Sequence, residues 1–175
     1  MEPPSVSRFS AQAVRRLIAI ALGLTSVAWP TLATSQCILQ LKNKAYVNLP
    51  PGICPRYTDM LLGKTNQQIY GGVICDRTEG SYILLQKLIK YTDQGKAIWQ
   101  VVQIKKISRP NSQSLIKGIG CQLQNKAKGS EPIFALVQPT SPYTYQTLAA
   151  WKGNLPDASF SHLEPKTVIC QDPMI

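Results

Sequence analysis

The chain has 175 residues, of which 44% are hydrophobic and 16% charged, and its 19 Lys/Arg outnumber nine Asp/Glu for a formal net charge of +10. This length predicts one domain with a core of its own, beside whatever the N-terminus contributes. The basic excess attracts polyanions or anionic surfaces, although charge also serves solubility alone.

The first 35 residues have the order of a secretory signal peptide. Arg15 and Arg16 precede an apolar run at 17–28, and small residues around Ala33 follow, as they do ahead of a cleavage site. The apolar run of about 12 residues is too short for a membrane-spanning helix, which needs ~20. We therefore expect cleavage near Ser35.

The expected organisation is a signal peptide at 1–35 and a single exported domain at 36–175, which is secreted or periplasmic and keeps no stable transmembrane segment after cleavage. A lipid-modified Cys37 is a further interpretation, but Gln36 stands where a lipobox carries Gly or Ala. Removal of residues 1–35 takes away three arginines and one glutamate, which leaves 16 Lys/Arg against eight Asp/Glu and a charge of +8.

All five cysteines lie in the expected exported domain: Cys37, Cys54, Cys75, Cys121 and Cys170. In an oxidising compartment they are disulfide partners, and an odd number leaves one thiol over after two bridges. The sequence alone does not fix the pairing. We expect Cys121 to pair with Cys170, and Cys75 to pair with either Cys54 or Cys37. A bridge closing the loop of ~50 residues between Cys121 and Cys170 contributes roughly 4 kcal/mol in the chain-entropy model.

The segment before residue 80 predicts two strands. Residues 37–47 alternate unevenly and predict a short edge strand, which the proline-rich residues after it end. Residues 57–62 predict at most one or two helical turns. Residues 69–75 predict a strand, in which two adjacent glycines suggest a bulge.

Residues 82–107 predict a hairpin, because two runs rich in β-branched and aromatic residues flank a polar turn at 93–96 that contains a glycine. The first run also fits a helical stripe with Ser81 as its N-cap, and the alternative is therefore a helix at 81–92 in an α+β fold. The strand is favoured because the turn leads straight into the second run. That second run carries apolar residues on both faces, which predicts a central strand covered on both sides.

The remaining chain predicts further short strands separated by turn-forming residues. The segments 115–123 and 133–138 predict a pair joined by a basic stretch, and 147–152 predicts a strand or a single helical turn. Short final strands are expected at 159–163 and 167–170. The total of six to eight strands predicts a mainly β fold, a single small antiparallel sheet or sandwich with little helix, stabilised by disulfides.

No catalytic, metal or cofactor motif is complete. The tail of a phosphate-binding loop occurs at 62–65, but Thr58 stands where that motif needs glycine. His162 is the only histidine; a Cys–His nucleophile pair would need it beside the leftover cysteine, and a surface residue is the preferred interpretation. No Cys-x-x-Cys, His pair or Gly-x-Ser-x-Gly occurs, and the acidic residues lie mostly in predicted turns. We predict no enzyme and no cofactor.

Paired lysines supply the candidate anion-binding residues: Lys87, Lys90, Lys105, Lys106, Lys126 and Lys128. In the predicted hairpin Lys87 and Lys105 lie on neighbouring strands, and some of the paired lysines would then form a basic patch near Tyr82 or Tyr91. The alternative is a solvated face that discourages aggregation. Trp151 is either a core residue or, if exposed beside the turn 153–157, a stacking platform for a sugar.

Four stretches, in order, resemble a family of small exported cyanobacterial proteins without an assigned activity. They are 96–102, 120–123, 131–137, and 149–152 followed by 168–170, and the resemblance covers residues 70–172. It implies that Cys121 and Cys170 form a family pair and that Cys75 belongs to a second pair. The presence of both Cys37 and Cys54 departs from a four-cysteine pattern, which leaves the partner of Cys75 open. The resemblance implies no catalytic residues.

These observations predict a non-catalytic exported protein that binds an anionic polymer, such as an acidic polysaccharide or another envelope component, through basic strand edges. The alternative is a protein-interaction or inhibitor module that uses the loops 108–114 and 153–157. A hydrolase is the minor alternative. Nucleic acid is not an expected partner, because the chain is predicted to be exported.

Overall fold

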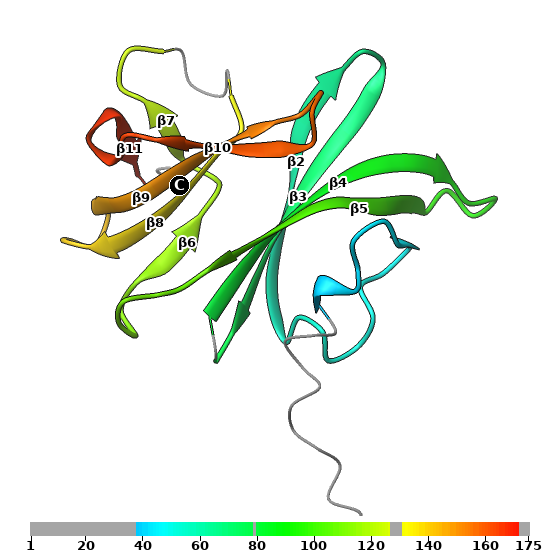
Figure 1. Cartoon of the computed structure of the whole chain (residues 1–175), viewed down its shortest axis with the longest axis horizontal. Coiled ribbons are helices and arrows are strands. Elements are labelled where there is room, and N and C mark those ends of the chain that lie inside the picture. Colours follow the sequence, from blue (N-terminus) through cyan, green and yellow to red (C-terminus); the bar gives the residue numbers. More distant parts are fainter. Residues whose placement is uncertain (1–37, 79, 127–130, 172–175) are drawn as a thin grey trace, which may run out of the picture. The chain divides into compact units, whose positions relative to one another are not determined.

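Antiparallel strands make up most of the chain that the computed structural model describes, namely residues 38–78, 80–126 and 131–171 (Figure 1). The predicted signal peptide, Cys37 and Lys128 lie outside these residues. The described elements are β1 (Ala45–Tyr46), β2 (Arg56–Thr65), β3 (Gln68–Arg77), β4 (Gly80–Tyr91), β5 (Ala97–Ile107), β6 (Leu115–Lys117), β7 (Cys121–Leu123), β8 (Ile133–Pro139), β9 (Tyr145–Asn154), β10 (Ser159–Leu163), the 3₁₀ helix η1 (Pro165–Thr167) and β11 (Val168–Cys170).

The strands form three antiparallel sheets. The first sheet has the order β1-β5-β4-β3-β2, the second β10-β9-β8-β6, and a third, small sheet pairs β11 with β7. The prediction of a mainly β, antiparallel fold is therefore confirmed, with more strands than expected. Among the described residues, no helix has the length and apolar character needed to cross a membrane.

The hairpin predicted at 82–107 is confirmed as β4 and β5. Its turn is closed by Thr92, whose N–H donates to the carbonyl of Lys96 at 2.8 Å, and Gly95 takes the positive φ of 77° that glycine adopts without strain. The alternative helix at 81–92 is wrong, because β4 pairs along both edges, with β3 and with β5. Pairing on both edges overrides the helical spacing of its leucines.

The central strand of the first sheet is β4, and not β5 as its apolar content suggested. Residues 80–86 of β4 are all buried, whereas β5 buries only Val101 and Ile107. On its outer edge β5 pairs only with Ala45 and Tyr46 of β1. Within the described part of the chain, most of that edge therefore has no neighbouring strand.

The short strand β1 is anchored through Tyr46. The Tyr46 hydroxyl donates to the side-chain oxygen of Gln86 on β4, and burial raises the pKa of Tyr46, so the hydroxyl keeps its proton. The edge strand predicted at 37–47 is thus reduced to two residues, and the residues before it form a turn in which the N–H of Leu41 donates to the carbonyl of Ile38.

The helical turns predicted at 57–62 are wrong, because β2 occupies the whole segment. It pairs with β3 from Arg56 opposite Asp76 to Thr65 opposite Gln68. Asn66 and Gln67 close this hairpin with φ values of 49° and 65°, the two positive angles of a tight two-residue turn. Local propensity in 57–62 is weak, and the strand pairing decides its structure.

The adjacent glycines of β3 serve close packing and not the bulge that was predicted there. The irregularity lies in β2, between Leu61 and Gly63. A Cβ added at Gly71 would lie 2.9 Å from the Gln86 amide nitrogen, and one added at Gly72 would lie 3.1 Å from the ring of Phe134. Each glycine therefore admits a neighbour against one face of β3.

Different parts of the chain cover the two faces of the first sheet. On one face, Ile38 and Leu41 from the segment before β2 pack in a cluster with Val73, Tyr82 and Leu84. On the other face the second sheet contributes a cluster with members from both sheets: Ile74, Ile83, Ile107, Ile116, Phe134, Leu136 and Trp151. The first sheet is therefore apolar on both faces.

Two disulfides reinforce the described fold. Cys54 is bonded to Cys75, which fastens the segment before β2 to β3, and Cys121 is bonded to Cys170, which joins β7 to β11. The sequence separations are 21 and 49, for which the chain-entropy model gives about 3 and about 4 kcal/mol. Of the two partners considered for Cys75, the structure selects Cys54.

The last strands follow the prediction with one exchange of partners. The segment 115–123 divides into β6, which pairs with β8 as expected, and β7, which pairs with β11 instead. β9 contains the ambiguous residues 147–152 as strand, and the strand predicted at 159–163 is confirmed as β10.

Candidate functional site: a basic cleft at one end of the first sheet

The lysines predicted to bind anions do not form one patch. Lys87 and Lys105 lie on neighbouring strands, but Lys87 is opposite Gln100 and Lys105 is opposite Ile83. Four residues of β4 separate the two positions, which is about 13 Å along a strand. The two lysines lie on neighbouring strands, as predicted, but the register places them toward different ends of the hairpin and not in one patch.

Lys105 and Lys106 lie near the end of β5 and contact different rings. The Lys105 ammonium lies 5.2 Å from the ring centroid of Trp151, and the Lys106 ammonium lies 6.0 Å from that of Tyr82. A cation over an aromatic face is attracted by the negative face of the ring. Both lysines thus have a structural partner beside any role in binding.

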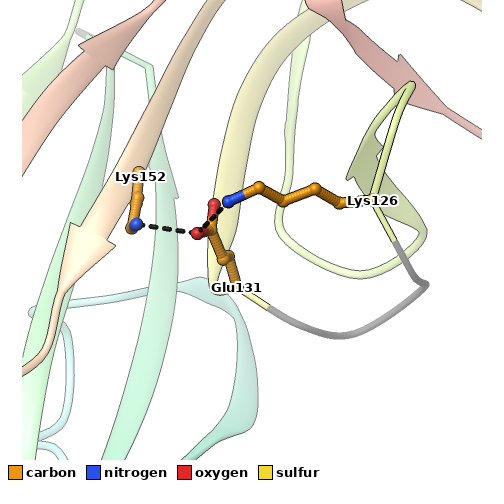
Figure 2. Close-up of polar contacts among 3 residues, drawn as sticks. All are labelled: Lys126, Glu131 and Lys152. Atoms are coloured by element: carbon orange, nitrogen blue, oxygen red, sulfur yellow. Dashed lines mark hydrogen bonds and ion pairs between the residues drawn. The ribbon is translucent and has the colours of Figure 1, made fainter.

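Lys126 is neutralised by a carboxylate. Figure 2 shows that Lys126 and Lys152 donate to the same Glu131 oxygen, at 2.7 and 2.8 Å. These two hydrogen bonds hold the pKa of Glu131 below its usual value. This pair of lysines is not a free anion site, and Lys128 lies outside the described residues.

Three arginines that the sequence analysis did not single out come together at one end of the first sheet. The antiparallel register brings the start of β2 beside the end of β3, with Arg56 opposite Asp76 and Arg77 opposite Gly80. The end of β5 reaches the same place, since Ile107 is opposite Ser81, and Arg109 follows it.

These residues line two adjoining hollows, which we call the strand-end cleft. The arginine side has a volume of about 380 Å³ and is lined by Pro55, Arg56, Asp76, Arg77, Thr78 and Arg109. The serine side has a volume of about 360 Å³ and is lined by Thr78, Gly80, Ser108, Arg109, Asn111 and Ser112. Thr78 and Arg109 form part of both walls, so the two hollows are neighbours.

Hydrogen bonds fix the residues of the cleft. The Arg109 guanidinium donates to the backbone carbonyl of Arg77 at 3.0 Å, and the side chain of Arg77 is buried. The Ser81 hydroxyl donates to the Asp76 carboxylate at 2.5 Å, which occupies one oxygen of that acid. The Arg109 guanidinium is thus held by a backbone carbonyl and the Arg77 side chain by burial, whereas Arg56 is exposed.

Asn111 organises the loop at the serine side. Its side-chain oxygen accepts from the backbone N–H of Gln113 at 3.1 Å and from both the N–H and the hydroxyl of Ser114 at 2.8 Å. This Asx turn uses the acceptor of the Asn111 amide and leaves its NH₂ donor. The loop therefore offers donors from Asn111 and hydroxyls from Ser108 and Ser112.

The charge of the cleft is suited to an oxyanion. A guanidinium presents a planar fork of donors that matches carboxylate, sulfate or phosphate oxygens in pairs. Among the described lining residues, Asp76 is the one acidic side chain against Arg56, Arg77 and Arg109. Residue 79, a glutamate by sequence, lies outside the described residues.

Sequence reasoning missed this cleft because its arginines are distant in the chain. Arg56 and Arg77 become neighbours only through the β2–β3 hairpin, and β2 was interpreted as a helical turn. The signal that was available is the loop 108–114, which was predicted as a contact loop and does line the cleft through Ser108, Arg109, Asn111 and Ser112. The second predicted contact loop, 153–157, begins inside β9 and buries Leu155.

The other candidate sites have structural partners. His162 on β10 is opposite Trp151 on β9, with ring centroids 6.4 Å apart. Every described cysteine is in a disulfide, so none of them forms the Cys–His pair. Trp151 is buried, which excludes the exposed sugar platform, and 62–65 lie in β2 and not in a phosphate-binding loop. The described residues contain no group of three or more His, Cys, Asp or Glu that would hold a metal ion.

Comparison of the chain with protein-family models, with curated proteins and with solved structures gave no match.

Proposed function

We propose that this is an exported, non-catalytic protein that binds an anionic polymer of the cell envelope through the strand-end cleft. The observation that carries the proposal is the convergence of Arg56, Arg77 and Arg109 on one cleft. Its other described lining residues supply hydroxyl, amide and backbone groups and a single carboxylate, that of Asp76. Family membership and signal cleavage stay part of the proposal, as the sequence suggests them.

The cleft supports a polymer better than a small enclosed ligand. Its two hollows adjoin through Thr78 and Arg109, so a ligand longer than one anionic group can follow both. Arg77 and Arg109 are positioned before a ligand arrives, which lowers the entropy lost on binding. The proposal therefore assigns binding to these arginines and not to the lysines predicted from the sequence. One of those lysines, Lys126, is already paired with Glu131.

The location is consistent with an envelope ligand. Two disulfides indicate an oxidising compartment outside the cytoplasm. The non-catalytic part of the proposal rests on the lining residues, in which the described carboxylate, Asp76, is engaged by Ser81. Because Asp76 is the one carboxylate of the described lining, the cleft offers no pair of acidic groups to act as general acid and general base.

The test compares two double variants that remove the same charge from opposite ends of the first sheet. Arg56→Ala/Arg109→Ala alters the cleft, and Lys64→Ala/Lys96→Ala alters the end where the β2–β3 and β4–β5 turns lie. Arg77 is left intact because its side chain is buried. The probe is sodium alginate, a polyuronate, measured by titration calorimetry at low ionic strength, with neutral dextran as the blank.

We expect the arginine variant to lose at least about tenfold in affinity, since each charge-assisted hydrogen bond is worth about 1.5–3 kcal/mol before losses elsewhere. The lysine variant loses less than about threefold, because exposed charges are screened. Equal losses in the two variants, or no binding by the wild-type protein, would overturn the proposed function.

A further inference from the structure

The two sides of the strand-end cleft differ in chemistry. The arginine side carries Arg56 and Arg77 as well as the shared Arg109. The serine side carries no charged residue of its own among the described lining residues, and presents Ser108, Asn111 and Ser112 beside the shared Arg109. One side is built for an anion and the other for neutral hydrogen-bonding groups.

We infer that the strand-end cleft binds an acidic polysaccharide in which a charged sugar is followed by an uncharged one. This inference rests on the proposed function and names its ligand class. The carboxylate of the charged sugar meets Arg56 and Arg109 on the arginine side. The neighbouring neutral sugar lies against the loop 108–114.

The serine side matches sugar hydroxyls because both partners donate and accept. A serine hydroxyl has one donor and two acceptor positions, and an asparagine NH₂ supplies two donors. Sugar hydroxyl and acetamido groups have both kinds of atom, and can satisfy both serines and the amide together. A phosphate or carboxylate oxygen only accepts, so it leaves the acceptor positions of both serines unused.

The distribution of charge also opposes a polymer that is charged at every unit. Such a ligand places its second anion on the serine side, where Arg109 is the shared cation. That guanidinium already donates to the Arg77 carbonyl at 3.0 Å and lines the arginine side as well. A second anion there would lose its hydration without the arginine contacts that offset this cost for the first anion.

The size of the two hollows agrees with neighbouring units of one chain. Their volumes are similar, about 380 and about 360 Å³, and they share a wall. Successive sugars in a polysaccharide are similar in size and directly linked. The arrangement therefore fits two adjacent units without a gap between them.

The experiment compares oligosaccharides of equal length with the intact protein at one fixed, low ionic strength. Hyaluronan and unsulfated chondroitin hexasaccharides alternate a uronate with a neutral amino sugar, and an oligogalacturonate hexamer carries a carboxylate on every unit. We expect at least one alternating probe to bind threefold or more tightly than oligogalacturonate, although it carries half the charge. Equal or tighter binding of oligogalacturonate would overturn the inference and leave the proposed function standing.

A pair of variants assigns the difference to the serine side. Ser108→Ala/Ser112→Ala removes two exposed hydroxyls, and we expect it to lower the affinity for the alternating probe by about tenfold while changing that for oligogalacturonate by less than twofold. Ser161→Ala on β10, which lines neither hollow, is the matched control and leaves both affinities unchanged. A serine variant that weakens both probes alike contradicts the two-sided cleft. Loss of all binding in wild type overturns the proposed function itself.

Discussion

The two ends of the first sheet both carry basic residues but differ in how those residues are held. At the cleft end, Arg77 is buried and Arg109 donates to its backbone carbonyl. At the other end, Lys64, Lys90 and Lys96 are exposed, and their ammonium groups make no hydrogen bond or ion pair with any residue that the structure describes. The two ends carry charges of the same sign, but the charged side chains are held differently.

This difference shows why a net positive charge does not by itself define a binding site. An exposed lysine has a flexible stem and a screened charge, so ordering it on a ligand offsets much of the gain. A guanidinium that strand pairing already positions avoids part of that cost. We therefore expect affinity to follow the fixed arginines and not the number of cations.

The largest expected effect is a loss of stability, and the variants that show it distinguish the roles of the two disulfides. Cys121→Ala/Cys170→Ala opens the loop of sequence separation 49 and should lower the free energy of unfolding by about 4 kcal/mol, measured by urea denaturation. Affinity for alginate, measured below the unfolding transition, should stay unchanged, because this bridge joins β7 to β11. An equal loss of affinity would mean that the cleft depends on the third sheet.

The matched variant, Cys54→Ala/Cys75→Ala, should lower stability by about 3 kcal/mol and also weaken binding. Cys54 lies two residues before Arg56, and its bond to Cys75 fixes the start of β2 beside β3. Unchanged affinity in this variant would show that strand pairing alone positions Arg56.

The sequence predicted the parts of this fold whose signals are local. The polar turn with Gly95 marks the β4–β5 hairpin, and the alternation at 159–163 marks β10. β2 gave no such signal, because it is an edge strand in which Arg56, Tyr57, Thr58 and Asp59 are all exposed. Burial is confined to its second half, where Met60 and Leu62 pack against a core cluster, and this alternation is too short to detect in the sequence.

The strand-end cleft was missed for a related reason. Its arginines come from β2, β3 and the loop after β5, and only the register of three strand pairings brings them together. Lysine pairs such as Lys105 and Lys106 are visible in the sequence, but adjacent residues of a strand point to opposite faces. Proximity along the chain therefore gave the wrong grouping.

A substitution that keeps the charge tests whether geometry matters at the cleft. Arg109→Lys retains the cation but cannot hold the Arg77 carbonyl and a carboxylate with one planar fork. We expect about a fivefold loss of affinity for alginate in titration calorimetry. The exchange Lys96→Arg at the opposite end is the control and should change affinity by less than twofold. Full affinity in Arg109→Lys would show that charge alone suffices.

The smallest effect concerns Glu131, which lies outside the lining of the cleft. Because Lys126 and Lys152 lower the pKa of its carboxyl, its contribution to stability is present at neutral pH and is lost as the pH falls through that lowered pKa. Glu131→Gln should lower the free energy of unfolding by about 0.5–1 kcal/mol at pH 7, a modest value because Lys126 is exposed. At pH 3 or below the difference from wild type should shrink toward zero. Urea denaturation at both pH values measures it, and a difference that grows at low pH would contradict the assigned ion pairs.

The glycine pair of β3 limits how this fold can change. Gly71 leaves room for Gln86 and Trp99, and Gly72 leaves room for Leu62 and the ring of Phe134. β3 thus lies between two hydrophobic cores, one on each face of the first sheet. A side chain gained at either position forces a neighbour to move. We therefore expect substitutions to be tolerated better in the loops that border the cleft than at Gly71 or Gly72.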